Sequence, residues 1–251
     1  MVAKAFGLKD KTAIVAGDSQ FWTQYVTTAL AKAGADVVVA AKDADKLDEA
    51  VKIARDLGRK AMAIPTDTTQ SDQVQQMVDQ VVADFGKIDI LVNTANTEFA
   101  KPILETSEED LRRVMDVNFT SVFLCCRAVG KYMIEQKKGR IINVSSCLAE
   151  RGVANGVAYC AAAGSVLQLT RALDLEWASH GITVNAIGAG WMSETNSAAE
   201  SQEDKLLRYI PMKRYGHPEE IGSLLVYLAS DATDFLTGQM LLVDGAVMAH
   251  L

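Results

Sequence analysis

The sequence predicts a three-layer, doubly wound α/β domain of the Rossmann-like class, and two observations lead to this prediction. Short runs of Val, Ile, Leu and Ala alternate with amphipathic helical segments along the 251 residues. The early helical segments each end at a glycine, the residue best suited to the positive φ that follows a helix. Strands that are apolar throughout are typical of a parallel sheet covered on both faces. Right-handed crossovers then give the Rossmann-like arrangement.

The pattern predicts seven strands with helices between them. The strands are expected at residues 12–16, 36–40, 61–64, 88–92, 140–144, 182–186 and 240–243. The helices are expected at residues 20–33, 44–57, 71–85, 108–137, 158–179 and 218–230, of which 108–137 reads as one long helix or as two that abut. No linker or repeat divides the chain, so residues 1–251 are expected to form a single domain.

The composition limits the classes of partner. Apolar residues make up 49% of the chain and charged residues 23%, which is typical of a globular protein. The net charge is −7 and the isoelectric point about 5.1, and such an acidic surface repels nucleic acids and anionic lipids. No apolar run approaches the ~18 residues of a membrane span, and the first residues have no signal-peptide core. We therefore expect a cytoplasmic protein that binds neither nucleic acid nor membrane.

The cysteines and histidines are not spaced for metal or triad chemistry. No C-x-x-C pair occurs, so neither zinc nor a disulfide framework is indicated. The histidines are scattered among loop and tail positions, which leaves no base for a Ser-His-Asp triad. We expect no metal site and reduced, mostly buried thiols. The residues concerned are Cys125, Cys126, Cys147, Cys160, His180, His217 and His250.

The loop after the first strand is the first candidate site, because ligands of doubly wound sheets bind at the carboxyl ends of the strands. A dinucleotide loop needs glycines for the tight turn, for close approach to the pyrophosphate and for helix packing. Residues 16–23 read A-G-D-S-Q-F-W-T, in which Gly17 is the only glycine. Asp18 adds a negative charge, which disfavours a phosphate at this position.

The whole chain resembles the short-chain dehydrogenases/reductases, whose first loop reads T-G-x-x-x-G-x-G. In this chain Ala16 stands for the threonine, and Phe21 and Thr23 stand for the second and third glycines. The resemblance implies that the Phe21 ring lies where a diphosphate would lie. The alternative is that the loop takes another path and binds a nucleotide in a different way.

Three of the four catalytic positions of that family are kept. Asn118 in D-V-N-F, Ser146 in N-V-S-S and Tyr159 thirteen residues later match its Asn, Ser and Tyr. Four residues after the tyrosine the family has Lys, and this chain has Ala163. A lysine there would lower the phenol pKa from its ordinary value of about 10 and would hold the nicotinamide ribose. The resemblance therefore implies remnants of a catalytic site and no functional catalytic residue.

The cofactor positions of the family are only partly kept. Asp67 in T-D-T-T matches its adenine-contacting Asp, and Asn93 in N-T-A-N matches the first Asn of N-N-A-G. Glu194 falls where a Thr contacts the nicotinamide carboxamide, although Thr195 follows directly. Lys42, just after the second strand, is placed to meet a 2′-phosphate if NADP binds. With its glycines replaced, the chain is expected to bind no cofactor.

The regions for assembly are better preserved. In the family, the helices that match 108–137 and 158–179 form a four-helix contact between subunits, and the small residues 161–164 permit close approach. Residues from about 211 to 251 match the C-terminal assembly region. The alternative is that these segments only stabilise the monomer.

This combination implies a non-catalytic subunit that assembles with an active paralogue, in a hetero-oligomer such as a tetramer. The partner would carry NAD and the intact motifs, and would oxidise a secondary alcohol. The pattern of losses further suggests a hydroxyacyl-CoA of aromatic (toluene/benzylsuccinate) degradation as its substrate.

Three other functions remain open at this point. A cofactor-independent enzyme, like the halohydrin dehalogenases, would need an Arg that Ala163 cannot replace. A weakly active NAD(P)-dependent oxidoreductase would use Lys42 and an unusual loop. A ligand-sensing module is compatible with a vacant site.

Overall fold

The computed structural model describes residues 6–17, 20–42, 44–195 and 206–249, and these form one seven-stranded sheet. All neighbouring strands are parallel, and their order is β3-β2-β1-β4-β5-β6-β7. The predicted fold class is therefore confirmed. The strands are β1 (Thr12–Ala16), β2 (Asp36–Ala41), β3 (Ala61–Pro65), β4 (Ile90–Asn93), β5 (Gly139–Ser146), β6 (Ile182–Ala189) and β7 (Met240–Val243).

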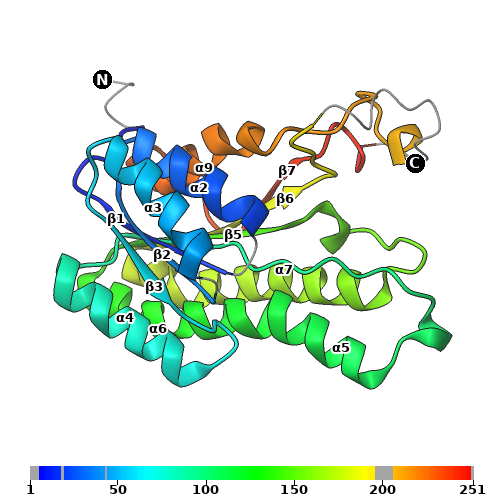
Figure 1. Cartoon of the computed structure of the whole chain (residues 1–251), viewed down its shortest axis with the longest axis horizontal. Coiled ribbons are helices and arrows are strands. Elements are labelled where there is room, and N and C mark those ends of the chain that lie inside the picture. Colours follow the sequence, from blue (N-terminus) through cyan, green and yellow to red (C-terminus); the bar gives the residue numbers. More distant parts are fainter. Residues whose placement is uncertain (1–5, 18–19, 43, 196–205, 250–251) are drawn as a thin grey trace.

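Helices cover the two faces of the sheet and complete three layers (Figure 1). Strand side chains alternate between the two faces. Val15 and Val39 belong to the core beneath the upper helices, whereas Ile14 and Val38 belong to the lower core. The upper helices are α2 (Gln20–Lys32), α3 (Ala44–Asp56) and α9 (Gly222–Ala229); the lower ones are α4 (Ser71–Phe85), α5 (Glu108–Met115), α6 (Ser121–Gln136) and α7 (Val157–Trp177).

The two strands next to the candidate site are longer than predicted. β5 and β6 pair over eight positions, from Gly139 with Ile182 to Ser146 with Ala189. The additional residues include serine and glycine, which have a low strand propensity, so neighbouring strands and not local preference extend them. As a result, Ser146 is the last residue of β5.

The long predicted helix is two α-helices joined by a π-helical turn, η2 (Asp116–Thr120). Such turns are rare in helices and often occur at functional sites. Asn118 lies within this turn.

Helix ends follow the predicted glycines, with one change in the C-terminal part. Gly34, Gly58 and Gly86 have φ of 106°, 74° and 78° after the first three helices. The segment predicted as a helix over 218–230 begins as a 3₁₀ turn, η6 (Pro218–Ile221), before α9. None of the helices in the described ranges is long and apolar enough to span a membrane.

Candidate active site

In doubly wound sheets a ligand-binding crevice forms at the topological switch point, which in this sheet lies at the carboxyl ends of β1 and β4. β2 and β3 extend from β1 to one side, and β5, β6 and β7 extend from β4 to the other. Adjacent loops therefore diverge at this switch point, where doubly wound sheets bind ligands. The loops after β1, β4, β5 and β6 all begin at this edge of the sheet. Most of the predicted site residues lie on or near these loops.

The loop after β1 is held tightly against the loop after β4. Gly17 has φ of 137°, and a Cβ at this position would lie 2.3 Å from the backbone nitrogen of Ala95. Thr23 is buried, and its hydroxyl lies 3.4 Å from the carbonyl oxygen of Gly17 and 3.5 Å from the Thr94 hydroxyl. The Thr23 side chain thus fills space that a glycine would leave open. Asp18, whose charge figured in the prediction, lies outside the described residues.

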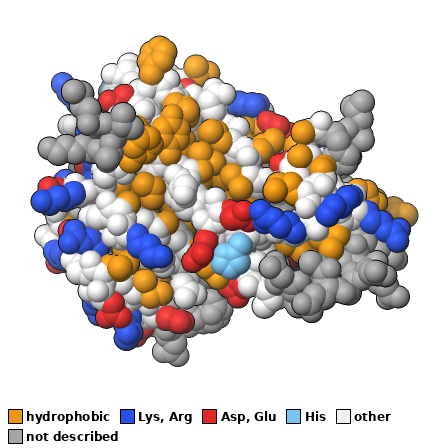
Figure 2. Space-filling view, turned by 90° about the horizontal axis from the view of Figure 1, so that it is seen from above, with side chains coloured by type: hydrophobic (Ala, Val, Ile, Leu, Met, Phe, Trp, Pro, Cys, Tyr) orange, Lys and Arg blue, Asp and Glu red, His pale blue; other side chains and the backbone are white. Residues whose placement is uncertain are grey.

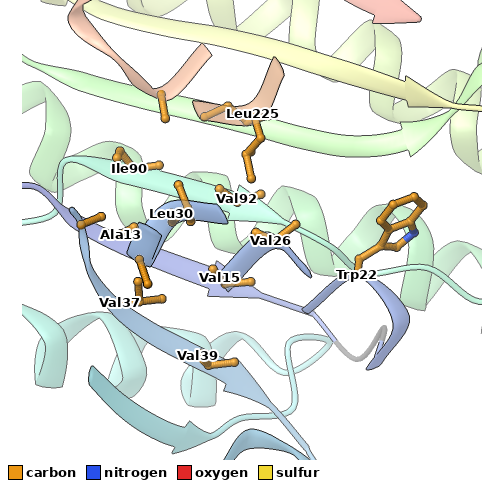
Figure 3. Close-up of a cluster of buried hydrophobic side chains, with 14 of the residues drawn as sticks. Ala13, Val15, Trp22, Val26, Leu30, Val37, Val39, Ile90, Val92 and Leu225 are labelled. Carbon is orange, nitrogen blue, oxygen red and sulfur yellow. The ribbon is translucent and has the colours of Figure 1, made fainter. Parts of the chain in front are cut away.

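The first turn of α2 carries aromatic side chains where a dinucleotide loop has small ones. Phe21 is half-buried against the upper core and meets Trp22 edge-on, with 4.9 Å between ring centroids. Trp22 is only 6% exposed and lies at the end of the core cluster nearest the strand tips (Figure 3). This turn is therefore built into the core, so its side chains serve packing.

Ser146 and Tyr159 are brought together, as the resemblance predicts. Ser146 ends β5, and its hydroxyl accepts a hydrogen bond from the Leu148 backbone nitrogen at 3.2 Å. Tyr159 lies in the first turn of α7, close enough to Ser146 and Asn96 for both side chains to act on the pKa of its phenol. Burial raises the pKa of Tyr159 above its ordinary value, and the lowering effect of Ser146 and Asn96 does not reverse this.

Ala163 lies one helical turn after Tyr159 and is 5% exposed. Residues four apart share one face of a helix, so its methyl group lies on the side of Tyr159. Among the described residues, Glu98 and Cys147 raise the pKa of Tyr159, and no cation is among the groups that lower it. The phenol therefore stays protonated near neutral pH.

Asn118 uses its amide to hold a loop. Its side-chain oxygen accepts from the Thr97 backbone nitrogen at 2.6 Å, and its Nδ2 donates to the Thr97 carbonyl at 2.9 Å. This pair of bonds ties the loop after β4 to the π turn. Asn118 is thus a positioning residue for that loop.

Asn93 holds the interior of the sheet. It is 1% exposed, and its Nδ2 donates to Asn143 Oδ1 at 2.8 Å. Asn143 in turn donates to the Thr170 hydroxyl at 2.9 Å, which links β4, β5 and α7. Asn93 therefore contributes to strand alignment beneath the crevice.

Asp67 and Lys42 form a pair that sequence reasoning missed. Lys42 Nζ lies 3.2 Å from Asp67 Oδ1, which also accepts from the Thr69 backbone nitrogen and hydroxyl at 3.0 and 2.6 Å. Burial raises the pKa of Asp67, but the bonds from Thr69 and the charge of Lys42 outweigh it and leave the pKa below its usual range. The cation expected to meet a 2′-phosphate is thus engaged with the residue expected to meet adenine.

A contact between α2 and the loop after β6 was also missed. Burial raises the pKa of Tyr25, and the negative charge of the exposed Glu194 raises it further. The Tyr25 ring meets His217 edge-on, with 5.6 Å between centroids and an interplanar angle of 82°. The sequence carried one signal for this contact, which is the aromatic side chain of Tyr25 in the first turns of α2, two residues after Thr23.

Two of the thiols next to the candidate site are buried and protonated. Burial raises the pKa of Cys126 to about 12 and that of Cys147 to about 11, so both stay protonated. His180 ends the 3₁₀ turn η4 (Ala178–His180) after α7, and His250 lies outside the described residues. Within the described ranges no group of three or more His, Cys, Asp or Glu side chains could hold a metal ion.

Known proteins are similar to this chain in both sequence and fold. A family model described as enoyl-(acyl carrier protein) reductase matches residues 24–247. A short-chain type dehydrogenase/reductase from Mycobacterium marinum superposes with a TM-score of 0.91 at 33% identity, over 100% of both chains. The chain belongs to the short-chain dehydrogenase/reductase family. It is thus a member of a family of NAD(P)-dependent oxidoreductases.

Two further proteins to which the chain is similar are named as dehydrogenases of sugar acids. The chain is 36% identical to 2-dehydro-3-deoxy-D-gluconate 5-dehydrogenase of Escherichia coli (strain K12), over 100% of both sequences. The structure of a gluconate 5-dehydrogenase from Burkholderia cenocepacia J2315, in complex with NADP and tartrate, has a TM-score of 0.92 at 30% identity over 100% of both chains.

Proposed function

We propose that this chain is the non-catalytic subunit of a hetero-oligomeric NAD-dependent dehydrogenase. The observation that carries the proposal is the buried methyl of Ala163 on the face of α7 that bears Tyr159. A phenol becomes a useful acid or base near neutral pH only when a neighbour lowers its pKa. Here burial raises that pKa, and the groups identified around Tyr159 supply no positive charge.

The phosphate end supports the same conclusion. A diphosphate needs open space and free backbone N–H groups at the start of the first helix. The described residues of this loop do not fit it, because Thr23 fills the gap between Gly17 and Thr94 and because Phe21 adds a ring to the same turn. We therefore infer that NAD binds to the partner and not to this chain.

The surface of α7 supports assembly. Its exposed residues include a stripe, spaced by four, seven, four and three positions, that is mostly small or apolar and lies beside the charged Arg171 and Glu176. Leu175, at the end of this stripe, is 84% exposed. Such side chains favour burial against another protein, and a divergent copy can replace one protomer of a symmetric assembly while the interface stays similar. The stripe comprises Val157, Ala161, Gln168, Ala172 and Leu175.

A second apolar surface strengthens this argument. Apolar side chains gather on the face that α2, α3 and α9 form, between acidic and basic groups (Figure 2). Two such surfaces on one chain suit a tetramer better than a dimer.

The proposed partner is a paralogue with intact G-x-x-x-G-x-G and Y-x-x-x-K motifs that oxidises a secondary alcohol. In its narrower form the proposal names a hydroxyacyl-CoA of aromatic (toluene/benzylsuccinate) degradation as the substrate. Only the pattern of lost residues supports this narrower form.

The test is co-expression of the chain with its paralogue, followed by native mass spectrometry and an assay of NAD reduction. We expect a mixed oligomer whose activity survives Tyr159→Phe in this chain and is abolished by the equivalent change in the partner. A homogeneous oligomer of this chain with full activity would refute the proposal.

A second candidate function is that of a weakly active NAD(P)-dependent oxidoreductase. It is favoured by the sugar-acid dehydrogenases among the relatives and by the approach of Ser146 to Tyr159. If this function is correct, the purified chain oxidises gluconate or a 2-dehydro-3-deoxy sugar acid slowly, and Ala163→Lys raises the existing rate. No turnover before or after that change would exclude it.

A further inference from the structure

A pocket lies at the carboxyl ends of β6 and β7, and we call it the C-terminal pocket. Its walls come from the loop after β6, from the segment that precedes η6 and from the end of β7, and it encloses about 130 Å³. β5 separates these strands from β4, so the pocket lies to one side of the crevice. The apolar side chains that line it are, in chain order, Trp191, Met192, Ile210, Met212 and Val243.

Backbone contacts join the three walls into a ring. The Gly216 backbone nitrogen donates to the Trp191 carbonyl at 3.1 Å, which ties the segment before η6 to the loop after β6. The Met212 backbone nitrogen donates to the Gly245 carbonyl at 3.3 Å, which ties the same segment to the end of β7. β6 and β7 pair within the sheet and close the ring. The frame is thus formed before a ligand binds, which limits the entropic cost of binding.

Two of the walls contain strained backbone. Lys213 and Ala246 have φ of 55° and 73°, in the left-handed region that favours glycine. Each directly follows a residue of the pocket, Met212 in one case and Gly245 in the other. Such strain persists only where the surrounding structure fixes it, and it is concentrated at active sites and ligand clamps. The strained positions therefore coincide with the walls that give the pocket its shape.

The charged side chains beside the pocket are engaged with partners. Arg214 binds Glu220 through both terminal nitrogens, at 2.7 and 2.8 Å. Asp244 accepts from the backbone nitrogens of Ala246 and Met248 at 2.9 and 2.8 Å. A charged ligand would have to disrupt one of these arrangements, whereas a neutral apolar group only displaces water from the apolar walls.

We propose that the C-terminal pocket binds a neutral aromatic ring or a branched hydrocarbon group of the same size. An engineered apolar cavity of about 150 Å³ binds benzene, and the volume of this pocket is similar. Met192 and Met212 have flexible, polarisable side chains that adapt to a ring and contact it favourably through sulfur. Met212 is 59% exposed, so the pocket can be entered from the surface. The inference goes beyond the proposed function and does not depend on it.

The probe is fluorobenzene, and 4-fluorobenzoate is its charged counterpart. We expect fluorobenzene to bind the full chain with a dissociation constant of about 1 mM or tighter in a fluorine NMR titration. The benzoate should bind at least about tenfold more weakly, because its carboxylate meets the acidic groups of Glu220 and Asp244. Equal binding of the two probes would overturn the neutral class proposed for the ligand.

Val243→Phe fills the pocket, and Leu242→Phe is the matched control. Both changes add a ring to β7, but successive side chains of a strand point to opposite faces, and Val243 is the one of the two that lines the pocket. We expect Val243→Phe to weaken fluorobenzene binding at least about tenfold and Leu242→Phe to leave it unchanged. Equal affinity of the parent and Val243→Phe would overturn the proposal.

A measurement on the parent chain covers the case in which Val243→Phe fails to fold. A bound aromatic ring shifts the NMR signals of methyl groups that it contacts. With methyl-labelled methionine, fluorobenzene should shift the signals of Met192 and Met212 and leave those of Met77 and Met133 in the lower core unchanged. Unchanged Met192 and Met212 signals near the solubility limit of fluorobenzene would overturn the proposal, and the proposed function would be unaffected.

Discussion

The two ends of the crevice differ from a dinucleotide enzyme in different ways. At the Tyr159 end, Ser146 and Tyr159 keep their relation and one side chain, at Ala163, departs. At the end formed by the loop after β1, several side chains depart together and are packed into the core. The first end therefore differs at a single side chain, whereas the second differs at several side chains that are part of the core, so that changing them would disturb the fold.

The largest effect is expected from Trp22→Ala. This side chain is fully packed at the tip of the upper core, and truncating such a side chain costs about 3–5 kcal/mol of unfolding free energy. Phe21→Ala, next to it and half-buried, should cost about 1 kcal/mol. Urea unfolding measures both. A cost of only about 1 kcal/mol for Trp22→Ala would show that the first turn of α2 is not part of the core and would weaken the contrast between the two ends.

The next effect concerns Gly17→Ala. The residue has φ of 137°, and an added Cβ would lie 2.3 Å from the Ala95 backbone nitrogen. Strain and clash together should lower the free energy of unfolding by about 3 kcal/mol. Gly58→Ala is the control, because φ there is 74° and no atom of the described residues lies within 4 Å of the added Cβ. Its cost should be about 1 kcal/mol, and a similar cost at both positions would contradict the close packing at Gly17.

A smaller effect is expected from Ala163→Lys, which tests whether the Tyr159 end is a local loss. The new ammonium should lower the raised pKa of Tyr159 by about one unit or more, because a nearby cation favours the phenolate. Alkaline spectrophotometric titration, with Tyr159→Phe in the same background as reference, measures the shift.

Ala161→Lys provides the control for this titration, since it adds the same charge to an exposed position of α7. We expect no shift of the Tyr159 pKa in that variant. Neither variant should gain NAD-dependent turnover while the loop after β1 is unchanged. Turnover by Ala163→Lys alone would show that the loop after β1 does not prevent cofactor binding, and would refute the contrast between the two ends of the crevice.

The smallest effect is expected from Glu220→Gln, in the group that holds Arg214 and the backbone of His217. The pKa of Glu220 is lowered from 4.5 to about 2, first by its hydrogen bond with Arg214 and then by the His217 backbone nitrogen. A lowered carboxyl pKa stabilises the fold above pH 4.5, and this contribution is lost as the pH falls toward 2. Because the pair is about two-fifths exposed, the change should cost less than about 1 kcal/mol at pH 7.

The pH dependence makes this last prediction specific. The difference in unfolding free energy between parent and Glu220→Gln should shrink between pH 4.5 and about 2. A difference that persists at pH 2 would mean that packing, and not the ion pair, holds this segment.

The strands and most helices could be predicted because they follow from local periodicity. The ends of β5 and β6 could not, since Ser146 and Gly188 join the sheet only through their neighbours. The π turn around Asn118 likewise has no distinct pattern in the sequence.

The candidate site residues could also be identified from the sequence, because spacing alone relates Ser146, Tyr159 and Ala163. The contacts around the site could not be predicted in this way. Lys42 pairs with a residue 25 positions later, and the ring of Tyr25 meets the ring of His217, 192 positions later. No spacing in the sequence encodes such encounters, which depend on how the loops converge in three dimensions.

The π turn at Asn118 fixes the loop after β4 independently of the residues around Tyr159. Both ends of its amide are engaged with the Thr97 backbone, so the loop after β4 keeps its path regardless of what stands at position 163. A backbone that is fixed in this way tolerates changes of the side chains around Tyr159, so this end of the crevice can vary in chemistry while the loop keeps its geometry.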